Sequence, residues 1–215
     1  MQLAEDKLEQ ALAEFSVQLR DPARQWFMQA LQGVNCGEKG LQNTALYSAM
    51  ARRKLGEEVY PGFPLPGHWT VAHVGRVFLL YRILLHYNNE SRALVFTRLY
   101  REGDEQEKIA WLKAMSLMDT QGLMVEHMVH AARTNSQEAY AAIALYNPYP
   151  ARHYCQEAFN QLVLKALFMD LDIRQVQGIL QRMNPTMKRL VTDLKEERRA
   201  AGRVFPQGID WLLSQ

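Results

Sequence analysis

The sequence predicts an all-α protein, built as an irregular multi-helix bundle or a short α-solenoid-like array of about ten to twelve helices. The 215 residues include only 12 glycines and 8 prolines, and these gather in a few places. Between those places apolar residues recur every three or four positions, which is the period of a helix with one buried face. No stretch alternates apolar and polar residues with β-branched enrichment, so no sheet is expected.

The first 55 residues are predicted to form three helices. The first has an apolar stripe with steps of four, three and four residues, made of Leu8, Leu12, Phe15 and Leu19. Asp21-Pro22 places a capping acid before a proline, so a second helix is expected to begin at that proline. A loop at 36–40, which contains two glycines, then precedes a third helix over about 41–55.

Residues 56–68 form the one long irregular segment, because three prolines and three glycines exclude a helix there. Apolar side chains such as Tyr60 and Phe63 indicate that it packs against the helices. It could be a linker after an N-terminal helical subunit, 1–55. We prefer a packed excursion within a single domain, 1–215, whose main core is expected over 69–205.

Beyond residue 68 the helical rhythm is regular, and capping signals mark several boundaries. Asp104 followed by acids and Asn184 followed by proline are start signals, and Gly103 and Gly202 stand where helices should stop. Helices are therefore expected at 70–87, 90–102, 104–118, 121–133, 136–146, 154–169, 173–182, 185–201 and 207–214.

The charge and cysteine content exclude several classes of protein. Lys and Arg total 25 against 23 Asp and Glu, and this balance gives no basis for nucleic-acid binding. Cys36 and Cys155 form neither a disulfide framework nor a CxxC pair, and His127 with His130 lacks the other ligands of a zinc site. We therefore expect no metal and no other cofactor.

The sequence also predicts a cytoplasmic protein without a membrane span. Glu5, Asp6 and Glu9 stand where a signal peptide would carry positive charge. The most apolar segment, 71–87, contains two arginines and two histidines, whereas a spanning helix needs roughly 20 mostly apolar residues. The helix expected at 185–201 carries alternating charges, typical of a solvated face, and weak contact with an anionic membrane surface stays open.

Polar residues at two helix junctions are candidates for ligand binding. Asn135 and Glu138 have the spacing of a capping box, and Arg133 would end the preceding helix; these structural roles do not exclude a pocket. The run 147–150, Asn-Pro-Tyr-Pro, has two prolines that fix the backbone and hold the groups around it, which are Asn147, Tyr149, His153 and Tyr154. A binding loop and a plain helix corner are equal alternatives here.

The helix around Lys165 is apolar on almost every side, so we expect other helices to surround it. Asn160, Gln161 and Lys165 interrupt it, and the last two lie one turn apart on one side. A lysine in such surroundings needs a partner or a route to water. We expect either an ion pair with Glu138 in a cleft beside the 147–150 corner, or a lysine that reaches solvent at the helix edge.

The second half of the chain contains a series of short motifs in one order and spacing. They are Arg133-Thr134-Asn135, Glu138-Ala139, Asn147-Pro148-Tyr149-Pro150, His153, Phe159-Asn160-Gln161, Leu164-Lys165-Ala166, Phe168, Asn184-Pro185 and Glu197-Arg198-Arg199-Ala200-Ala201-Gly202-Arg203. Through these motifs the chain resembles the EboA family, described as metabolite-traffic proteins of a bacterial gene cluster, and the resemblance is specific over roughly 130–205. Other members often carry Trp where this chain has Phe159.

The resemblance implies a bacterial helical protein that works beside enzymes of secondary metabolism, and it brings no catalytic residues with it. We expect a non-enzymatic accessory protein that binds a small metabolite intermediate or another protein of the ebo cluster, and supports its maturation or export. One alternative is an enzyme that uses Lys165, Glu138 and His153; another is a helical scaffold without a small-molecule site. The candidate ligand-binding residues are Arg133, Asn135, Glu138, Asn147, Tyr149, His153, Asn160, Gln161 and Lys165.

Overall fold

The computed structural model of the chain describes residues 1–204 and 208–215. The described part contains thirteen α-helices and one 3₁₀-helix, and its β-structure is confined to a single bridge between Val59 and Thr70. The prediction of an all-α protein is confirmed. The helix count exceeds the expected one because the predicted helix 104–118 is interrupted at Ala114 and a short helix forms at the 147–150 corner.

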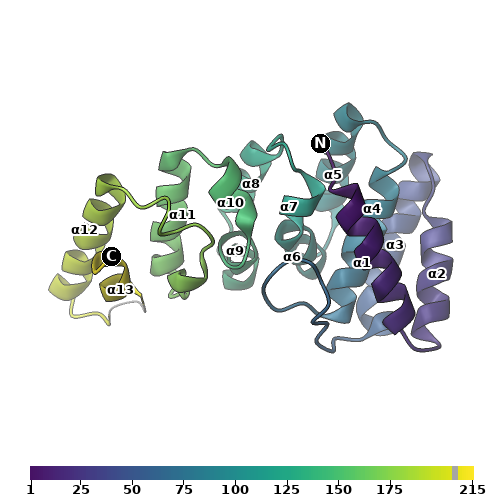
Figure 1. Cartoon of the computed structure of the whole chain (residues 1–215), viewed down its shortest axis with the longest axis horizontal. Helices are drawn as coiled ribbons and strands as arrows, with labels where there is room; N and C mark the ends of the chain where they lie inside the picture. The colour runs from purple at the N-terminus through teal and green to yellow at the C-terminus, as the bar shows by residue number, and fades with distance from the viewer. Residues whose placement is uncertain (205–207) are drawn as a thin grey trace. The chain divides into compact units, whose positions relative to one another are not determined.

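The chain divides into two compact units, Met1–His127 and Met128–Gln215 (Figure 1). The single-domain organisation expected from the sequence stays a prediction. The predicted core, 69–205, and the predicted helix 207–214 each have one end at a residue outside the described range. The helix found in the latter region is α13, Ile209–Leu213.

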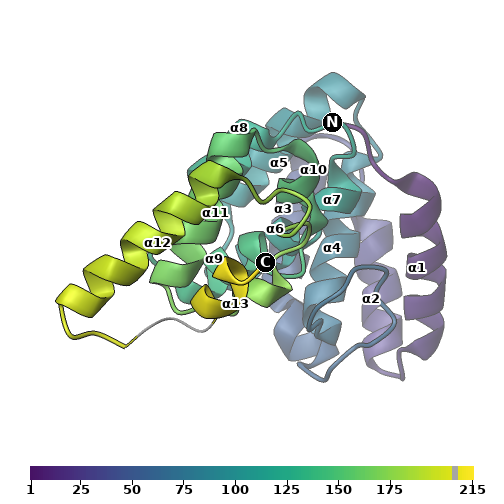
Figure 2. The ribbon, with the colours of Figure 1, turned by 60° about the vertical axis from the view of Figure 1, so that its left-hand side comes forward.

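The first unit is built around one buried helix, α4 (Val71–Leu84), which contacts α1, α2, α3, α5 and α6. Figures 1 and 2 show α1 to α4 lying alongside one another. The apolar character of 71–87 therefore reflects a central core position. Its other helices are α1 (Glu5–Gln18), α2 (Ala23–Gly33), α3 (Gly37–Leu55), α5 (Asn89–Glu102), α6 (Glu105–Lys113) and α7 (Met115–Met118), while α8 (Val125–Ala131) crosses the boundary between the units.

The irregular segment 56–68 packs against the first unit, as predicted. Tyr60 and Phe63 are buried. The Tyr60 ring meets Phe15 of α1 edge-on at 5.1 Å, and the Phe63 ring lies 4.1 Å from the ring of Trp69. In the described part of the chain, no helix combines the length and the apolar character needed to cross a lipid bilayer.

The second unit has α11 (Gln156–Phe168) at its centre. Helix α11 contacts α9 (Gln137–Ala144) and α12 (Pro185–Ala200), and Figure 1 shows it lying between them. This arrangement confirms the prediction that other helices surround the Lys165 helix. The remaining elements are α10 (Pro148–His153), the 3₁₀-helix η1 (Ile173–Gln175) and α13, which packs on α12.

Several predicted helix boundaries are confirmed by their hydrogen bonds. The Asp104 carboxylate accepts from the Glu107 backbone N–H at 2.7 Å, and the Glu107 carboxylate accepts from the Asp104 N–H, which completes a capping box. The Asn184 side chain accepts from the Met187 N–H at 3.0 Å, with a proline at the first helical position. Helix α5 ends at Gly103 as expected.

Two predicted boundaries in the first unit are wrong. Helix α2 starts at Ala23 after a turn at Asp21 and Pro22, so the proline occupies the N-cap position and the acid does not cap the helix. The predicted loop 36–40 is the start of α3. Gly40 stands there because a Cβ atom at this position would lie 1.5 Å from the Asn35 carbonyl oxygen, so the glycine reflects close packing.

Two predicted boundaries in the second unit are also wrong. The N-cap of α9 is Ser136, whose hydroxyl accepts from the Ala139 N–H at 3.2 Å, and the expected cap Asn135 precedes it. The expected helix 173–182 is only the short η1 followed by turns. Gly178, with φ of 73°, interrupts this segment, and a Cβ atom there would lie 2.8 Å from that of Ala151.

Candidate functional site

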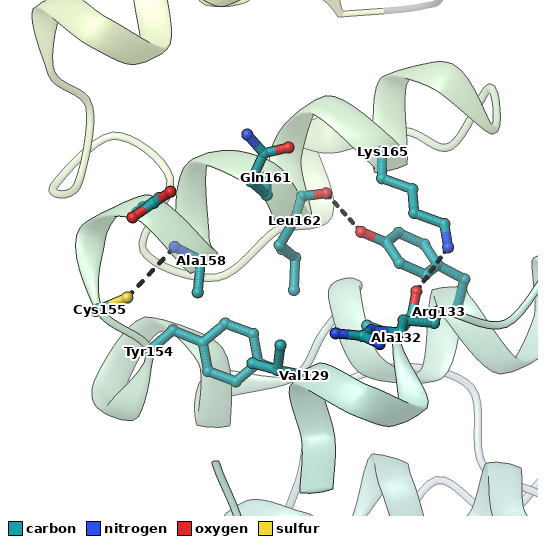
Figure 3. A pocket seen from close by; sticks show the side chains of 11 residues that line it. Val129, Ala132, Arg133, Tyr154, Cys155, Ala158, Gln161, Leu162 and Lys165 are labelled. Atoms are coloured by element: carbon teal, nitrogen blue, oxygen red, sulfur yellow. Dashed lines mark hydrogen bonds between the residues drawn. The ribbon is translucent and has the colours of Figure 1, made fainter. Parts of the chain in front are cut away.

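A pocket of about 420 Å³ lies in the second unit between α11 and the segment that leads out of α8 (Figure 3). Its walls combine small apolar side chains, two tyrosine rings and four polar or charged groups besides a thiol. The lining residues are Val129, Ala132, Arg133, Tyr140, Tyr154, Cys155, Glu157, Ala158, Gln161, Leu162 and Lys165. Three of the nine predicted ligand-binding residues are among them, namely Arg133, Gln161 and Lys165.

The Lys165 ammonium is held by the backbone at the C-terminal end of α8. It donates to the carbonyl oxygens of Ala132 at 2.6 Å and Thr134 at 2.8 Å, and it lies 4.8 Å from the centre of the Tyr140 ring. Carbonyls at a helix C-terminus and the face of an aromatic ring both attract a cation. Partial burial lowers the pKa of Lys165 from its ordinary value. The expected ion pair with Glu138 is therefore replaced by contacts with backbone carbonyls and a ring.

Arg133 also lines the pocket, and Figure 3 shows it on the wall formed by the segment that leads out of α8. The two carbonyls that bind Lys165 belong to Ala132 and Thr134, the residues on either side of Arg133. Lys165 therefore contacts the backbone next to Arg133. Arg133 is exposed, and within the described residues neither cation takes part in an ion pair. The lining of the pocket therefore includes two positive charges.

Two tyrosines from different elements form part of the pocket wall. The Tyr140 hydroxyl, on α9, donates to the Leu162 carbonyl oxygen at 2.9 Å. Tyr154 follows α10 and is 5% exposed; its buried hydroxyl has no hydrogen-bond partner among the described residues. Burial raises the pKa of both phenols, so both are neutral donors at physiological pH.

The far end of the pocket is formed by the start of α11. Figure 3 shows Cys155 and Tyr154 there, opposite Lys165. The exposed Cys155 is a free thiol whose sulfur accepts from the Ala158 N–H at 3.5 Å. Glu157, Gln161 and Lys165 follow at four-residue intervals, so all three lie along one side of α11. A shallower groove of about 370 Å³ between α11 and α12 also includes Gln161 and Lys165.

Three of the other candidates stabilise the junctions between helices. Asn147 is buried; its side chain accepts from the Tyr149 N–H at 3.0 Å and donates to the Ala142 carbonyl at 3.0 Å, which joins α9 to α10. Tyr149 is fully buried, and its ring lies 4.7 Å from the ring of His153. The 147–150 corner thus supplies a rigid turn, and the residues that follow it supply the pocket wall.

Asn160 links α11 to α12. It is 4% exposed, and its side-chain oxygen accepts from the amide of Gln156 at 2.9 Å and from the amide of Asn184 at 2.9 Å. Asn135 and Glu138, the remaining candidates, are exposed at the start of α9 and lie outside the pocket lining.

Tyr140 and Glu157 line the pocket but were not predicted as site residues. The spacing of Glu157, Gln161 and Lys165 could have identified the glutamate, because all three fall on one helix face. Nothing in the sequence marks Tyr140, which reaches the pocket through the packing of α9 on α11. Within residues 1–204 and 208–215, no three His, Cys, Asp or Glu side chains gather as a metal-binding group.

Comparison with protein families supports the resemblance drawn from the second half of the chain. A family model described as metabolite traffic protein EboA matches residues 12–213. Comparisons with curated proteins and with solved structures gave no match. The family match extends over nearly the whole chain, including the first unit, for which the sequence had offered only helical periodicity. The chain belongs to the EboA family of metabolite traffic proteins.

Proposed function

We propose that this protein is a non-enzymatic accessory protein that binds a small metabolite intermediate in the pocket beside Lys165, and so supports its maturation or export. The cytoplasmic location expected from the sequence is part of this proposal. The observation that carries it is the pocket itself, since its volume of about 420 Å³ falls in the range of small-molecule sites. Such sites combine apolar walls with a few well-placed polar groups, as this one does.

The arrangement of the polar groups favours binding over catalysis. The proposed enzyme alternative required Lys165, Glu138 and His153 in one cleft, but only Lys165 lines the pocket. Lys165 uses two of its three ammonium N–H groups for hydrogen bonds to backbone carbonyls. A lysine held in this way is suited to fixing a ligand's position, since a nucleophilic lysine must present a free amine.

The scaffold alternative is less well supported, because a scaffold would bury its polar residues in a closed core. Asn147 and Asn160 do follow that pattern, and each is bound within the fold. Arg133, Gln161 and Cys155 do not, because they are exposed at the pocket. A partner protein would instead be expected to use a broad face.

The two cysteines provide a direct test. Both are exposed free thiols, but Cys155 lines the pocket and Cys36 lies in the first unit. The protein should be incubated with small-molecule extract from cells that express the ebo cluster, then treated briefly with iodoacetamide and analysed by peptide mass spectrometry. We expect the extract to slow the alkylation of Cys155 several-fold and to leave Cys36 unchanged. Native mass spectrometry of the same sample should detect a retained small molecule.

A variant that fills the pocket supplies the control. Ala158→Trp should block both the protection of Cys155 and the retained mass, while Thr186→Trp, an exposed position on α12 outside the pocket, should preserve both. Equal protection of both cysteines, or a retained molecule in Ala158→Trp, would contradict the proposal.

A further inference from the structure

We infer that the pocket takes an elongated, largely apolar small molecule with one acidic group, a carboxylate or a phosphate, bound against Arg133 and Lys165. This inference rests on the proposed function, because it names the chemical class of ligand for the same pocket. Three features of the described residues carry it: the paired cations, the apolar walls between the two ends, and a buried hydroxyl without a partner.

The two cations that line the pocket assign the acidic group to the part of its wall formed by Arg133 and Lys165. The ammonium of Lys165 bonds to the carbonyls on both sides of Arg133, and both side chains line the pocket. An ammonium has three protons, and two are used, so one is available to an anion. The Arg133 guanidinium, which has no ion pair within the described part of the chain, can bind a carboxylate or a phosphate through two parallel bonds.

The middle of the pocket is apolar, and its length sets the size of the ligand body. Val129, Ala158 and Leu162 form this part, with the Tyr140 ring at the Lys165 end and the Tyr154 ring at the other end. Glu157 and Lys165 are eight residues apart on α11, which corresponds to about 12 Å along the helix axis. The Glu157 carboxylate repels an acid at its own end, so a ligand with one acidic group is oriented with that group toward Lys165.

The Tyr154 hydroxyl indicates a second polar contact. Its atom is buried, it has no partner in the described structure, and the residue lines the pocket. Burial of a hydroxyl without a hydrogen bond is unfavourable, and a ligand oxygen or nitrogen would relieve it. We therefore expect a polar atom within the otherwise apolar body of the ligand.

The test uses four probes with one naphthalene ring and different head groups. These are 2-naphthylacetate, 2-naphthyl phosphate, the neutral 2-naphthylacetamide and the cationic 2-(2-naphthyl)ethylamine, each titrated against the full chain while the anisotropy of naphthalene fluorescence is measured. One or both anions should bind at least tenfold more tightly than the amide, and the amine should bind most weakly. The ratio between acetate and phosphate decides between a carboxylate and a phosphate.

The decisive variant is Arg133→Gln, because Arg133 is exposed and its side chain makes no hydrogen bond within the described residues. It should weaken the anions about tenfold and leave the amide unchanged. The matched control is Arg189→Gln, an exposed arginine of α12 outside the pocket, which should change neither. Equal binding of amide and anion, or anion binding that Arg133→Gln leaves intact, would overturn the acidic ligand and leave the proposed function standing. Binding of none of the four probes would overturn the inference too, and the Cys155 experiment would still report on the proposed function.

Discussion

Two lysines, one in each unit, are held by the same kind of contacts but differ in what surrounds them. Lys113, at the end of α6, donates to the His68 carbonyl and lies 4.4 Å from the centre of the Trp69 ring. Lys165 donates to two carbonyls and lies 4.8 Å from the Tyr140 ring. A carbonyl and an aromatic face thus replace a carboxylate partner in both cases.

The surroundings give the two lysines different roles. Lys113 attaches the end of the irregular segment to α6, and its nearest titratable neighbours include the half-buried His73. Lys165 and a second cation, Arg133, both line a pocket. Lysines of this kind can be purely structural, so the functional argument at Lys165 depends on the second cation and the cavity. Substitutions that separate these roles test the comparison.

The largest expected effect is the pH dependence of the folding stability that arises from His73, a neighbour of Lys113. Burial, followed by the charge of Lys113, lowers the pKa of His73 to about 4 from the ordinary value of 6.5. The folded state therefore favours the neutral ring. The contribution of His73 to the free energy of unfolding is fully present above pH 6.5. It is lost as the pH falls from 6.5 to 4, by at most about 3 kcal/mol, because the unfolded chain binds the proton more tightly.

Urea denaturation at several pH values between 4 and 7.5 measures this loss. His73→Gln should show a smaller decline in the free energy of unfolding over that range than the wild type does. Parallel curves for the two proteins would contradict the assignment of the neutral state to His73.

The second effect is the cost of removing the Lys165 contacts. Lys165→Met loses two hydrogen bonds from a charged donor, and it should lower the free energy of unfolding by about 2 kcal/mol. Combining it with Glu138→Gln should give additive effects within about 0.5 kcal/mol, since the lysine bonds to carbonyls. Thermal or urea melts of the wild type, the two single variants and the double variant check this. A coupling energy well above about 0.5 kcal/mol would instead support the ion pair with Glu138 that was expected from the sequence.

The smallest effect of a substitution at pH 7 is expected at Lys113. Burial lowers its pKa to about 8 from 10.5, so the folded state disfavours the charge even though it is hydrogen-bonded. At pH 7, Lys113→Met should change the free energy of unfolding by less than about 1 kcal/mol, because the lost bond and the relief of charge burial oppose each other. Wild-type stability should rise as the pH increases from 8 toward 10.5, since only the unfolded chain retains the proton.

The variant Lys113→Met should lose that rise, and urea melts at pH 7, 8.5 and 9.5 would measure it. A variant that is much less stable than the wild type at pH 7 would show that Lys113, like Lys165, contributes mainly through its hydrogen bond.

Local sequence signals predicted the helices where a single side chain decides the boundary. Asp104 with Glu107 and Asn184 with its following proline are examples, because each cap bonds to a backbone N–H three residues away. Predictions failed where two signals competed or packing decided. Ser136 rather than Asn135 caps α9, and Gly40 lies inside α3 because the Asn35 carbonyl approaches it.

The sequence by itself determined the all-α class, the central position of the Lys165 helix and the family, since apolar periodicity and short motifs are written in consecutive residues. It also identified Arg133, Gln161 and Lys165 as candidates. Only the tertiary structure decided which candidates share a pocket. The acceptors of Lys165 are backbone carbonyls, which every residue has and no sequence pattern marks. Tyr140 reaches the pocket only because α9 packs on α11.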